Sequence, residues 1–290
     1  MSQILVVGNA LIDHIYEVGH YPAEDEELRA TSQTQTLGGN GTNTVQVLQQ
    51  LGHLCTLLNT FAADSQGEWL RQQLEQQGIE IGYSPVLAGY QTPNSVILLN
   101  QQTGSRTIIH HRHLPELAQE ALNNLPLAQY DWFHFEGRNV EVLPHLIKQV
   151  RQHQLKARIS LELEKNRAGL EVLIGLVDVV FISQAYWQAQ YPHLTPQQWL
   201  QQLSSHYPHT IMTLTLGKQG ALVLDKGAEI QHVTVPTVQV VDTLGAGDTF
   251  NAGMIAALCE GQNTLEAVHF AVQLAQRKVQ QYGLARLVKH

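Results

Sequence analysis

Two glycines and an aspartate late in the chain have the types and spacing of a phosphate-binding turn. Residues 240–252 run from a β-branched segment into the turn 245–247, after which Asp248 precedes an apolar pattern with helical spacing. Glycine adopts backbone angles that other residues avoid, so the amides of Ala246, Gly247 and Asp248 can point at one spot. The dipole of the following helix favours negative charge there. The stretch therefore predicts an anion site with a carboxylate beside it.

The carboxylate of Asp248 admits two interpretations. An aspartate next to a phosphate is repelled by it, unless the aspartate handles a proton or a metal ion during phosphoryl transfer. The alternative is an ordinary glycine turn in which Asp248 serves as the N-cap of the following helix. The residues of this stretch alone leave both interpretations open.

A second glycine-rich stretch, residues 37–44, precedes another helical pattern and contains Gly39, Asn40 and Asn43. Glycine permits close approach of the backbone, and the two amide side chains offer both donors and acceptors, which suits a neutral polyol. No Gly-Lys-Ser/Thr follows, so the stretch is not a Walker loop, and Thr44 stands where a dinucleotide fingerprint has its third glycine. The alternative is a plain helix start with an asparagine cap.

Acidic residues near the N-terminus are further candidates for ligand binding. The β-branched run at residues 4–7 predicts a buried strand that ends at Gly8, and Asp13 follows it. Open α/β sheets bind ligands just beyond the carboxyl ends of their strands, although Asp13 can equally face solvent on the next strand. The acidic turn at residues 24–27, which contains Asp25, is by itself typical of a solvated loop.

Composition narrows the class of protein. With 290 residues, 43% hydrophobic and 14% charged, the chain is expected to form a well-packed domain, and its net charge of −8 disfavours nucleic acid and anionic membranes as partners. Cys55 and Cys259 lie in separate apolar segments, so the sequence suggests neither a disulfide scaffold nor a zinc site. The histidines of residues 110–113 have no nearby cysteine or carboxylate to complete a metal site. No leader or long apolar run is evident, so a cytoplasmic location is expected.

Strand-like and helix-like segments alternate through most of the chain. Four short strands, two within residues 13–36 and two at residues 95–99 and 106–110, lie outside this rhythm and are expected to form a small sheet that acts as a lid or dimer surface. The remaining strands are expected at residues 4–7, 54–61, 132–135, 158–163, 178–182, 211–216 and 221–224. Helices are expected at residues 45–51, 65–77, 140–150, 196–203, 250–258 and 265–279.

The two glycine-rich stretches together resemble the signatures of the ribokinase-like (pfkB-type) carbohydrate kinases. Further matches at residues 136–139 and 162–165 point to the branch of that family that phosphorylates ketohexoses. The resemblance implies a three-layer α/β fold, with a mainly parallel central sheet flanked by helices. It also implies a single domain over residues 1–290, with a β-clasp lid formed by residues 13–36 and 90–113.

The resemblance also implies a reaction. The γ-phosphate of ATP would pass to a primary hydroxyl of fructose to give fructose 1-phosphate, with Asp248 as the base and residues 245–248 as the anion hole. The substrate-binding residues would be Asp13, Asp25, Gly39, Asn40, Asn43, Arg106 and Asp248. The nucleotide-binding residues would be Arg106, Ser183, Thr215, Gly217, Gly220, Gly245 and Gly247. The alternatives are another sugar or nucleoside as acceptor, or a non-catalytic regulatory protein that binds sugar.

Three further expectations concern charge, metal ions and assembly. A carboxylate at a helix N-terminus should be more acidic than its reference, so Asp248 is expected to be a weak base. Residues 183–186 depart from the family's Asn-x-x-Glu pattern, so Mg²⁺ is expected on the ATP phosphates and water, with Glu164 contributing through water. The resemblance leaves room for a monovalent cation such as K⁺. It implies a homodimer formed through the clasp, in which Asp25 reaches the partner's sugar site.

Overall fold

A computed structural model describes residues 1–288. Its main sheet has eight strands in the order β14-β13-β12-β11-β10-β9-β1-β4, in which the strands from β12 to β4 are parallel and the last two pairings at the other edge are antiparallel. The strands of this sheet are β1 (Gln3–Val7), β4 (Leu54–Leu58), β9 (Trp132–Glu136), β10 (Arg158–Leu163), β11 (Val179–Ile182), β12 (Ile211–Thr215), β13 (Ala221–Leu224) and β14 (Gln231–Val233).

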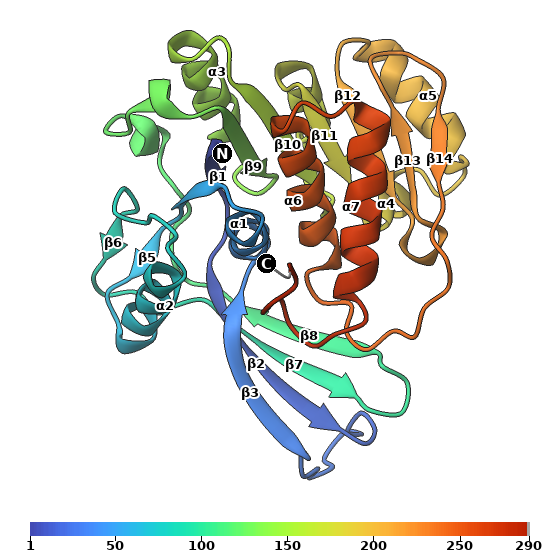
Figure 1. Cartoon of the computed structure of the whole chain (residues 1–290). Coiled ribbons are helices and arrows are strands. Elements are labelled where there is room, and N and C mark those ends of the chain that lie inside the picture. The colour runs from blue at the N-terminus through green and yellow to red at the C-terminus, as the bar shows by residue number, and fades with distance from the viewer. Residues whose placement is uncertain (289–290) are drawn as a thin grey trace.

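Helices cover both faces of the main sheet, which gives three layers (Figure 1). One hydrophobic core lies under α1 (Asn40–Gln50), α2 (Ser65–Gln76), α6 (Ala246–Cys259) and α7 (Thr264–Lys278). The other lies under α3 (Leu143–His153), α4 (Gln184–Gln190) and α5 (Pro196–His206). Successive residues of a strand point to opposite faces, so Ile4 enters the first core and Leu5 the second. This explains why the central strands are apolar throughout.

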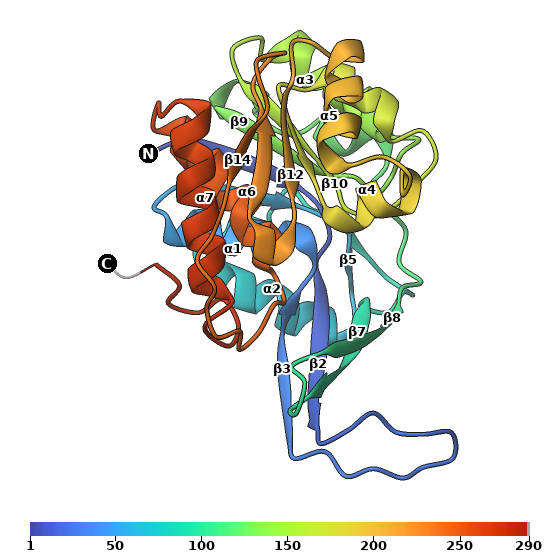
Figure 2. The ribbon, with the colours of Figure 1, turned by 90° about the vertical axis from the view of Figure 1, so that its right-hand side faces the viewer.

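A smaller sheet projects from one end of the molecule (Figure 2). Its order is β3-β2-β7-β8, with β2 (Leu11–Val18), β3 (Ser32–Gly38), β7 (Asn94–Asn100) and β8 (Arg106–His111). Strand β2 follows β1 after only three residues, so the two sheets are joined directly. Strand β8 is an edge strand and is exposed along its whole length. The four short strands expected outside the main rhythm therefore do form one sheet.

Several segments differ from the sequence-based expectation in their boundaries. The strand expected at residues 54–61 is interrupted, because β5 (Phe61–Ala62) pairs with β6 (Val86–Leu87) in a separate two-stranded sheet. Helix α3 begins at Leu143 instead of residue 140, with a proline in its first turn. Helix α4 and strand β14 were not expected. Short 3₁₀ helices complete the structure at Gln119–Leu122, Leu127–Gln129, Glu171–Leu176 and Gly217–Gln219.

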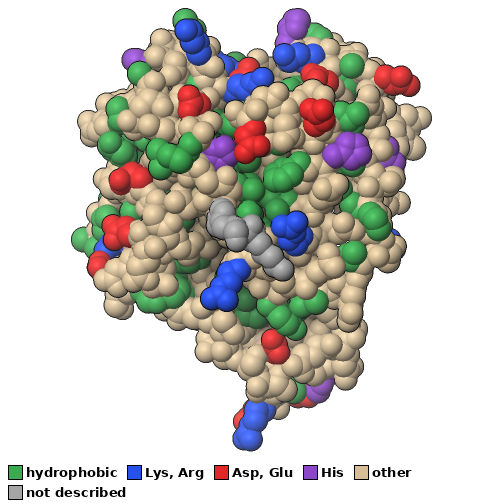
Figure 3. All heavy atoms as spheres, viewed as in Figure 1, with side chains coloured by type: hydrophobic (Ala, Val, Ile, Leu, Met, Phe, Trp, Pro, Cys, Tyr) green, Lys and Arg blue, Asp and Glu red, His purple; other side chains and the backbone are tan. Residues whose placement is uncertain are grey.

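Lys and Arg side chains are dispersed over the face shown in Figure 3. Among the helices of residues 1–288, none has both the length and the apolar character needed to cross a membrane. The α/β class, with a mainly parallel sheet between helical layers, is confirmed.

Candidate active site

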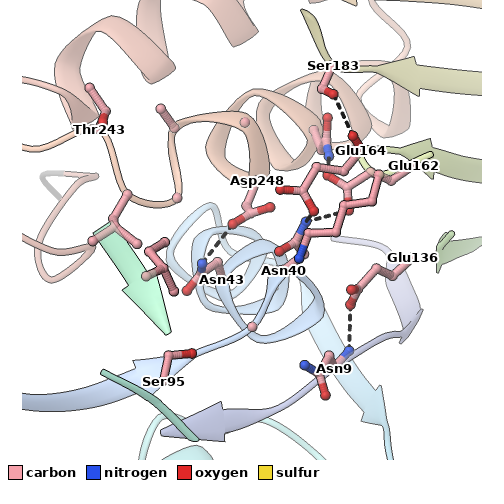
Figure 4. Close-up of a pocket in the computed structure, with 18 of the residues that line it drawn as sticks. Asn9, Asn40, Asn43, Ser95, Glu136, Glu162, Glu164, Ser183, Thr243 and Asp248 are labelled. Atoms are coloured by element: carbon pink, nitrogen blue, oxygen red, sulfur yellow. Dashed lines mark hydrogen bonds between the residues drawn. The ribbon is translucent and has the colours of Figure 1, made fainter. Parts of the chain in front are cut away.

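A cavity of about 270 Å³ lies where strand ends of the main sheet meet the N-termini of α1 and α6 and the small sheet. Parallel strands end at a common edge, so residues far apart in sequence converge there. Twelve of the residues expected from the sequence line this cavity (Figure 4). They are Asp13, Gly39, Asn40, Asn43, Arg106, Glu164, Ser183, Thr215, Gly245, Ala246, Gly247 and Asp248.

The turn before α6 presents unpaired amides to the cavity. Gly245 has φ of 72°, a left-handed conformation that favours glycine, and α6 starts at the next residue. Within the described chain, the amides of Gly245, Gly247 and Asp248 have no hydrogen-bond acceptor. A Cβ built on Gly247 would meet no atom within 4 Å, so this residue borders open space. The turn can therefore bind an anion with several N–H groups and the positive end of the helix dipole.

Asp248 lies in the first turn of α6 and is only 6% exposed. The alternative that it caps the helix is wrong, because Gly245 occupies the N-cap and the Asp248 carboxylate instead accepts a 2.7 Å hydrogen bond from Asn43 Nδ2. Figure 4 shows the two side chains pointing toward each other across the N-termini of α6 and α1. Asn43 thereby fixes the orientation of the carboxylate.

The expectation that Asp248 is unusually acidic is also wrong. Burial raises the pKa of Asp248 well above its usual value, and the carboxylates of Glu164 and Glu136 raise it further, against the hydrogen bond from Asn43. Loss of water and the nearby negative charges thus outweigh the hydrogen bond from Asn43. A carboxylate with a raised pKa holds a proton more tightly, so Asp248 is a stronger base than an exposed aspartate.

Asn40 is held by two glutamates from β10 and its carboxyl end. Its Nδ2 donates to Glu162 Oε2 at 3.0 Å and to Glu164 Oε2 at 3.1 Å. Both amide hydrogens are therefore used, which leaves the Asn40 oxygen as an acceptor for a hydroxyl group. Glu162 also accepts from Asn251 of α6 at 2.9 Å, so this buried side chain links three elements.

Glu136, at the end of β9, joins the other half of the site. Its Oε2 accepts from the amide of Asn9 at 2.7 Å and that of Gly41 at 3.3 Å, and Arg138 forms a 3.6 Å ion pair with it. Glu136 and Glu162 were not among the residues expected to form the site. Their position as the polar ends of two buried strands was the sequence signal that identifies them.

The small sheet contributes side chains of both charges. Arg106 of β8 contacts the hydroxyl of Thr243, just before the anion-binding turn. Asp13 of β2 also lines the cavity, and burial raises its pKa to about 6, while a hydrogen bond from the Ser95 side chain opposes the shift. The Arg106 guanidinium beside the turn is suited to bind an anionic group. The Asp13 carboxylate, farther along the cavity, is suited to bind a hydroxyl group.

Three expected residues do not line the cavity. Asp25 lies in the exposed loop between β2 and β3, with φ of 62°. Gly217 and Gly220 lie in the turn between β12 and β13, where a Cβ on Gly220 would come within 2.0 Å of the Val233 carbonyl oxygen. Among residues 1–288, no cluster of three His, Cys, Asp or Glu side chains could hold a metal ion, and this includes the histidines of residues 110–113.

In this site the unpaired amides can bind a phosphate group. The buried Asp248 carboxylate beside them can remove a proton from a nearby group.

The family model of the pfkB family carbohydrate kinases matches residues 1–289. Ketohexokinase of Mus musculus is 33% identical over 299 residues, and the alignment covers 99% of this chain and 99% of the mouse protein. The chain therefore belongs to the pfkB family of carbohydrate kinases.

Solved structures share the fold over nearly the whole chain. Adenosine kinase from Sinorhizobium meliloti has a TM-score of 0.84 and 24% identity, and the match covers 99% of this chain and 96% of that one. Ribokinase from Arabidopsis thaliana, complexed with ribose and ATP, has a TM-score of 0.80 and 21% identity, with 99% and 95% coverage. The expected ribokinase-like architecture is thus confirmed.

The open space at Gly247 gives a first prediction. We expect Gly247→Ala to fold normally, because alanine is favoured over glycine in a helix by up to about 1 kcal/mol. Its methyl group would project toward the anion site and lower turnover with ATP by roughly 10²-fold. Gly245→Ala is the matched contrast, since its left-handed φ should cost about 1–2 kcal/mol of stability. Normal turnover of Gly247→Ala would contradict this assignment.

The buried charge of Asp248 gives a second prediction. Its folded pKa is raised, so its contribution to stability is present at low pH and lost as pH rises through that pKa. Asp248→Asn should therefore raise the free energy of unfolding at pH 8 by about 1–3 kcal/mol, and the gain should shrink toward pH 4. Thermal unfolding at several pH values measures this. Glu229→Gln, on an exposed loop, is the control, and equal effects of the two substitutions would contradict the prediction.

Proposed function

We propose that this chain is an ATP-dependent ketohexose kinase that converts fructose to fructose 1-phosphate. The observation that carries the proposal is the Asp248 carboxylate, oriented by Asn43 and placed at the N-terminus of α6 beside amides without acceptors. A phosphoryl transfer needs stabilisation of charge on the transferred group and a group that accepts the hydroxyl proton. The cavity offers both within one helical turn.

Each step of the transfer has a residue suited to it. The acceptor hydroxyl would lie against Asp248, whose carboxylate takes its proton as the bond to phosphorus forms. The leaving ADP oxygen takes up the negative charge released when the terminal bond of ATP breaks. The amides of Gly245, Gly247 and Asp248 would stabilise the charge on the transferred group, whereas the Ala246 amide donates to the Thr243 carbonyl oxygen. Arg106 would add a positive charge nearby.

The polar groups of the acceptor end support a neutral sugar. The Asn40 oxygen and the Asp13 carboxylate accept hydrogen bonds from hydroxyl groups, while the backbone at Gly39 allows close approach. Carboxylates at Asp13 and Glu164 would repel a sugar that already carries phosphate. The choice of a ketohexose follows the 33% identity to mouse ketohexokinase. A nucleoside is the second candidate because of the adenosine kinase of similar fold.

The nucleotide would lie on the other side of the anion-binding turn. Ser183 and Thr215, which follow β11 and end β12, line the cavity there. Gly217 and Gly220 come next along the chain and would flank the nucleotide. The complex of Arabidopsis ribokinase with ATP supports this nucleotide on a similar fold.

The carboxylates of the cavity fit an indirect role in holding Mg²⁺. Oxygen ligands suit this ion, but residues 1–288 form no preformed cluster of three acidic or histidine ligands. Glu164 faces the cavity and would orient a water molecule of an ion that arrives with ATP. When bound, Mg²⁺ would neutralise charge on the phosphates.

The exposed edge of the small sheet supports a homodimer. Ile108 and Ile109 on β8 are 47% and 63% exposed, and unpaired edge strands tend to be covered. We infer that the small sheet is a β-clasp lid, formed by residues 13–36 and 90–113, through which two copies associate. The loop that carries Asp25 would then reach the sugar site of the partner.

Release of ADP tests the proposed reaction. With Mg²⁺ and ATP, we expect turnover with fructose to exceed that with aldoses, nucleosides and sugar phosphates. Asp248→Asn should lower turnover by roughly 10²–10⁴-fold, because a positioned base is lost. Turnover of Asp248→Asn within a few fold of wild type would contradict the role of Asp248. Binding of sugar without turnover of any acceptor would instead favour a regulatory protein.

Mixing of two impaired variants, at a sugar concentration too low to saturate Asp25→Ala, tests the role of Asp25. We expect Asp25→Ala to weaken sugar affinity without changing ATP affinity. If Asp25 acts across a dimer, re-associated mixtures of Asp25→Ala and Asp248→Asn should regain activity, with up to roughly a quarter of the sites intact. Glu120→Ala, an exposed residue outside both sheets, mixed with Asp248→Asn measures the effect of subunit exchange. No gain in the first mixture would mean that Asp25 acts within its own subunit or not at all.

A further inference from the structure

A lysine is completely buried behind the anion-binding turn. Lys278 is the last residue of α7, and its side chain has 0% exposure. Lysine is almost never fully buried unless its charge is paired. The phosphoryl transfer proposed above does not use this residue, so its burial calls for a separate explanation.

The Lys278 ammonium has three oxygen partners. Its Nζ donates to Asp242 Oδ2 at 2.6 Å, to the Asp242 carbonyl oxygen at 3.1 Å and, more weakly, to the Gln281 carbonyl oxygen at 3.5 Å. An ammonium group has three hydrogens and no acceptor, so these partners match its hydrogen-bonding capacity. Burial lowers the pKa of Lys278, while the hydrogen bond and charge of Asp242 oppose the shift.

Asp242 transmits this contact to the anion-binding turn. Its Oδ1 accepts from the amide of Leu244 at 2.8 Å, and its Oδ2 also accepts from the amide of Gly283 at 3.1 Å. The amides of Val241 and Asp242 both bond to the Val279 carbonyl oxygen, which ties the same segment to the end of α7. Leu244, the residue immediately before Gly245, is therefore held by the Asp242 carboxylate. The Lys278 ammonium in turn holds that carboxylate.

We propose that Lys278 is a positioning residue that serves as an internal monovalent cation and fixes the turn 242–245, so that the unpaired amides at the start of α6 converge on the phosphate. The proposal rests on the proposed kinase function. Lys278 would not touch the substrate and would act through Asp242 and Leu244. A shift of about 1 Å in such donors is enough to impair transfer of the phosphoryl group.

The same contacts disagree with the monovalent cation that the family resemblance left open. A carboxylate and two carbonyl oxygens are the kind of ligands that a hard cation such as K⁺ requires. Around Asp242 these oxygens already contact the Lys278 ammonium. A K⁺ ion does not fit at this position beside the lysine, so K⁺ should not be required there.

Lys278→Met tests the proposal, because methionine has a similar length and no charge. We expect its turnover to fall by roughly 10²-fold, with KM for sugar and ATP changed much less. Hydrogen exchange should become faster at the amides of Leu244 and Gly283, which Asp242 protects in the wild type. Lys148→Met, an exposed residue of α3, is the matched control and should alter neither measurement.

A double variant separates positioning from stability. Lys278→Met leaves the Asp242 charge buried and unpaired, so its Tm should fall. In Asp242→Asn/Lys278→Met no unpaired charge remains, and the Tm should recover while turnover stays low. Recovery of both would overturn the proposal, because it would assign Lys278 a purely structural role. This variant also keeps the test informative if the single variant does not fold.

Small cations give a third measurement. Lys278→Ala opens space beside the oxygens of Asp242 and Gln281, so K⁺ or ammonium should partly restore its turnover, whereas tetramethylammonium should not. Wild-type turnover should be the same in all three chloride salts. A wild-type requirement for K⁺, or no rescue of the alanine variant, would overturn the internal-cation proposal.

The exchange measurement distinguishes the kinase proposal from the inference about Lys278. If the wild type phosphorylates no acceptor, the kinase proposal fails, yet faster exchange at Leu244 and Gly283 in Lys278→Met would still support the anchoring of the turn. If the wild type is active and Lys278→Met has the exchange rates and turnover of the wild type, only the inference about Lys278 is overturned.

Discussion

The site depends on one constraint, which is that Asp248 must keep its carboxylate out of water beside a turn built to attract negative charge. Burial and the neighbouring acids make this arrangement unfavourable for the free protein, as the raised pKa of Asp248 indicates. The hydrogen bond from Asn43 limits the cost. The fold thus tolerates a locally unfavourable carboxylate with a raised pKa, an arrangement that is common at functional sites.

The rest of the architecture serves to bring charges together at one edge of the main sheet. Glu136 is the last residue of β9 and Glu162 the last but one of β10. Their side chains bind the segment after β1 and residues near the N-termini of α1 and α6. The acids therefore act as connectors between elements, in addition to setting the electrostatic potential of the cavity. The small sheet closes the arrangement from the other side with Asp13 and Arg106.

Buried carboxylates have different partners on the two sides of the anion-binding turn. On the cavity side, Glu162 and Glu164 share the side-chain amide of Asn40 as donor, and burial raises the pKa of Asp248. Behind the turn, Asp242 is paired with Lys278 and with two backbone amides, which leaves it fixed. A rigid support beneath a strained electrostatic site is what preorganised catalysis requires.

The sequence by itself determined the fold class, the strands whose ends carry polar residues, and the glycine turn at residues 245–247, because these depend on periodicity and on local backbone preference. Tertiary structure alone decided that Asp248 is a stronger base, that both Asn40 hydrogens are used, and that Lys278 lies behind the turn. The charges that raise the pKa of Asp248 belong to Glu164 and Glu136, and the hydrogen bond between Asn40 and Glu162 joins residues 122 positions apart. No local pattern records such pairs, so only the folded chain determines how these side chains ionise and bind.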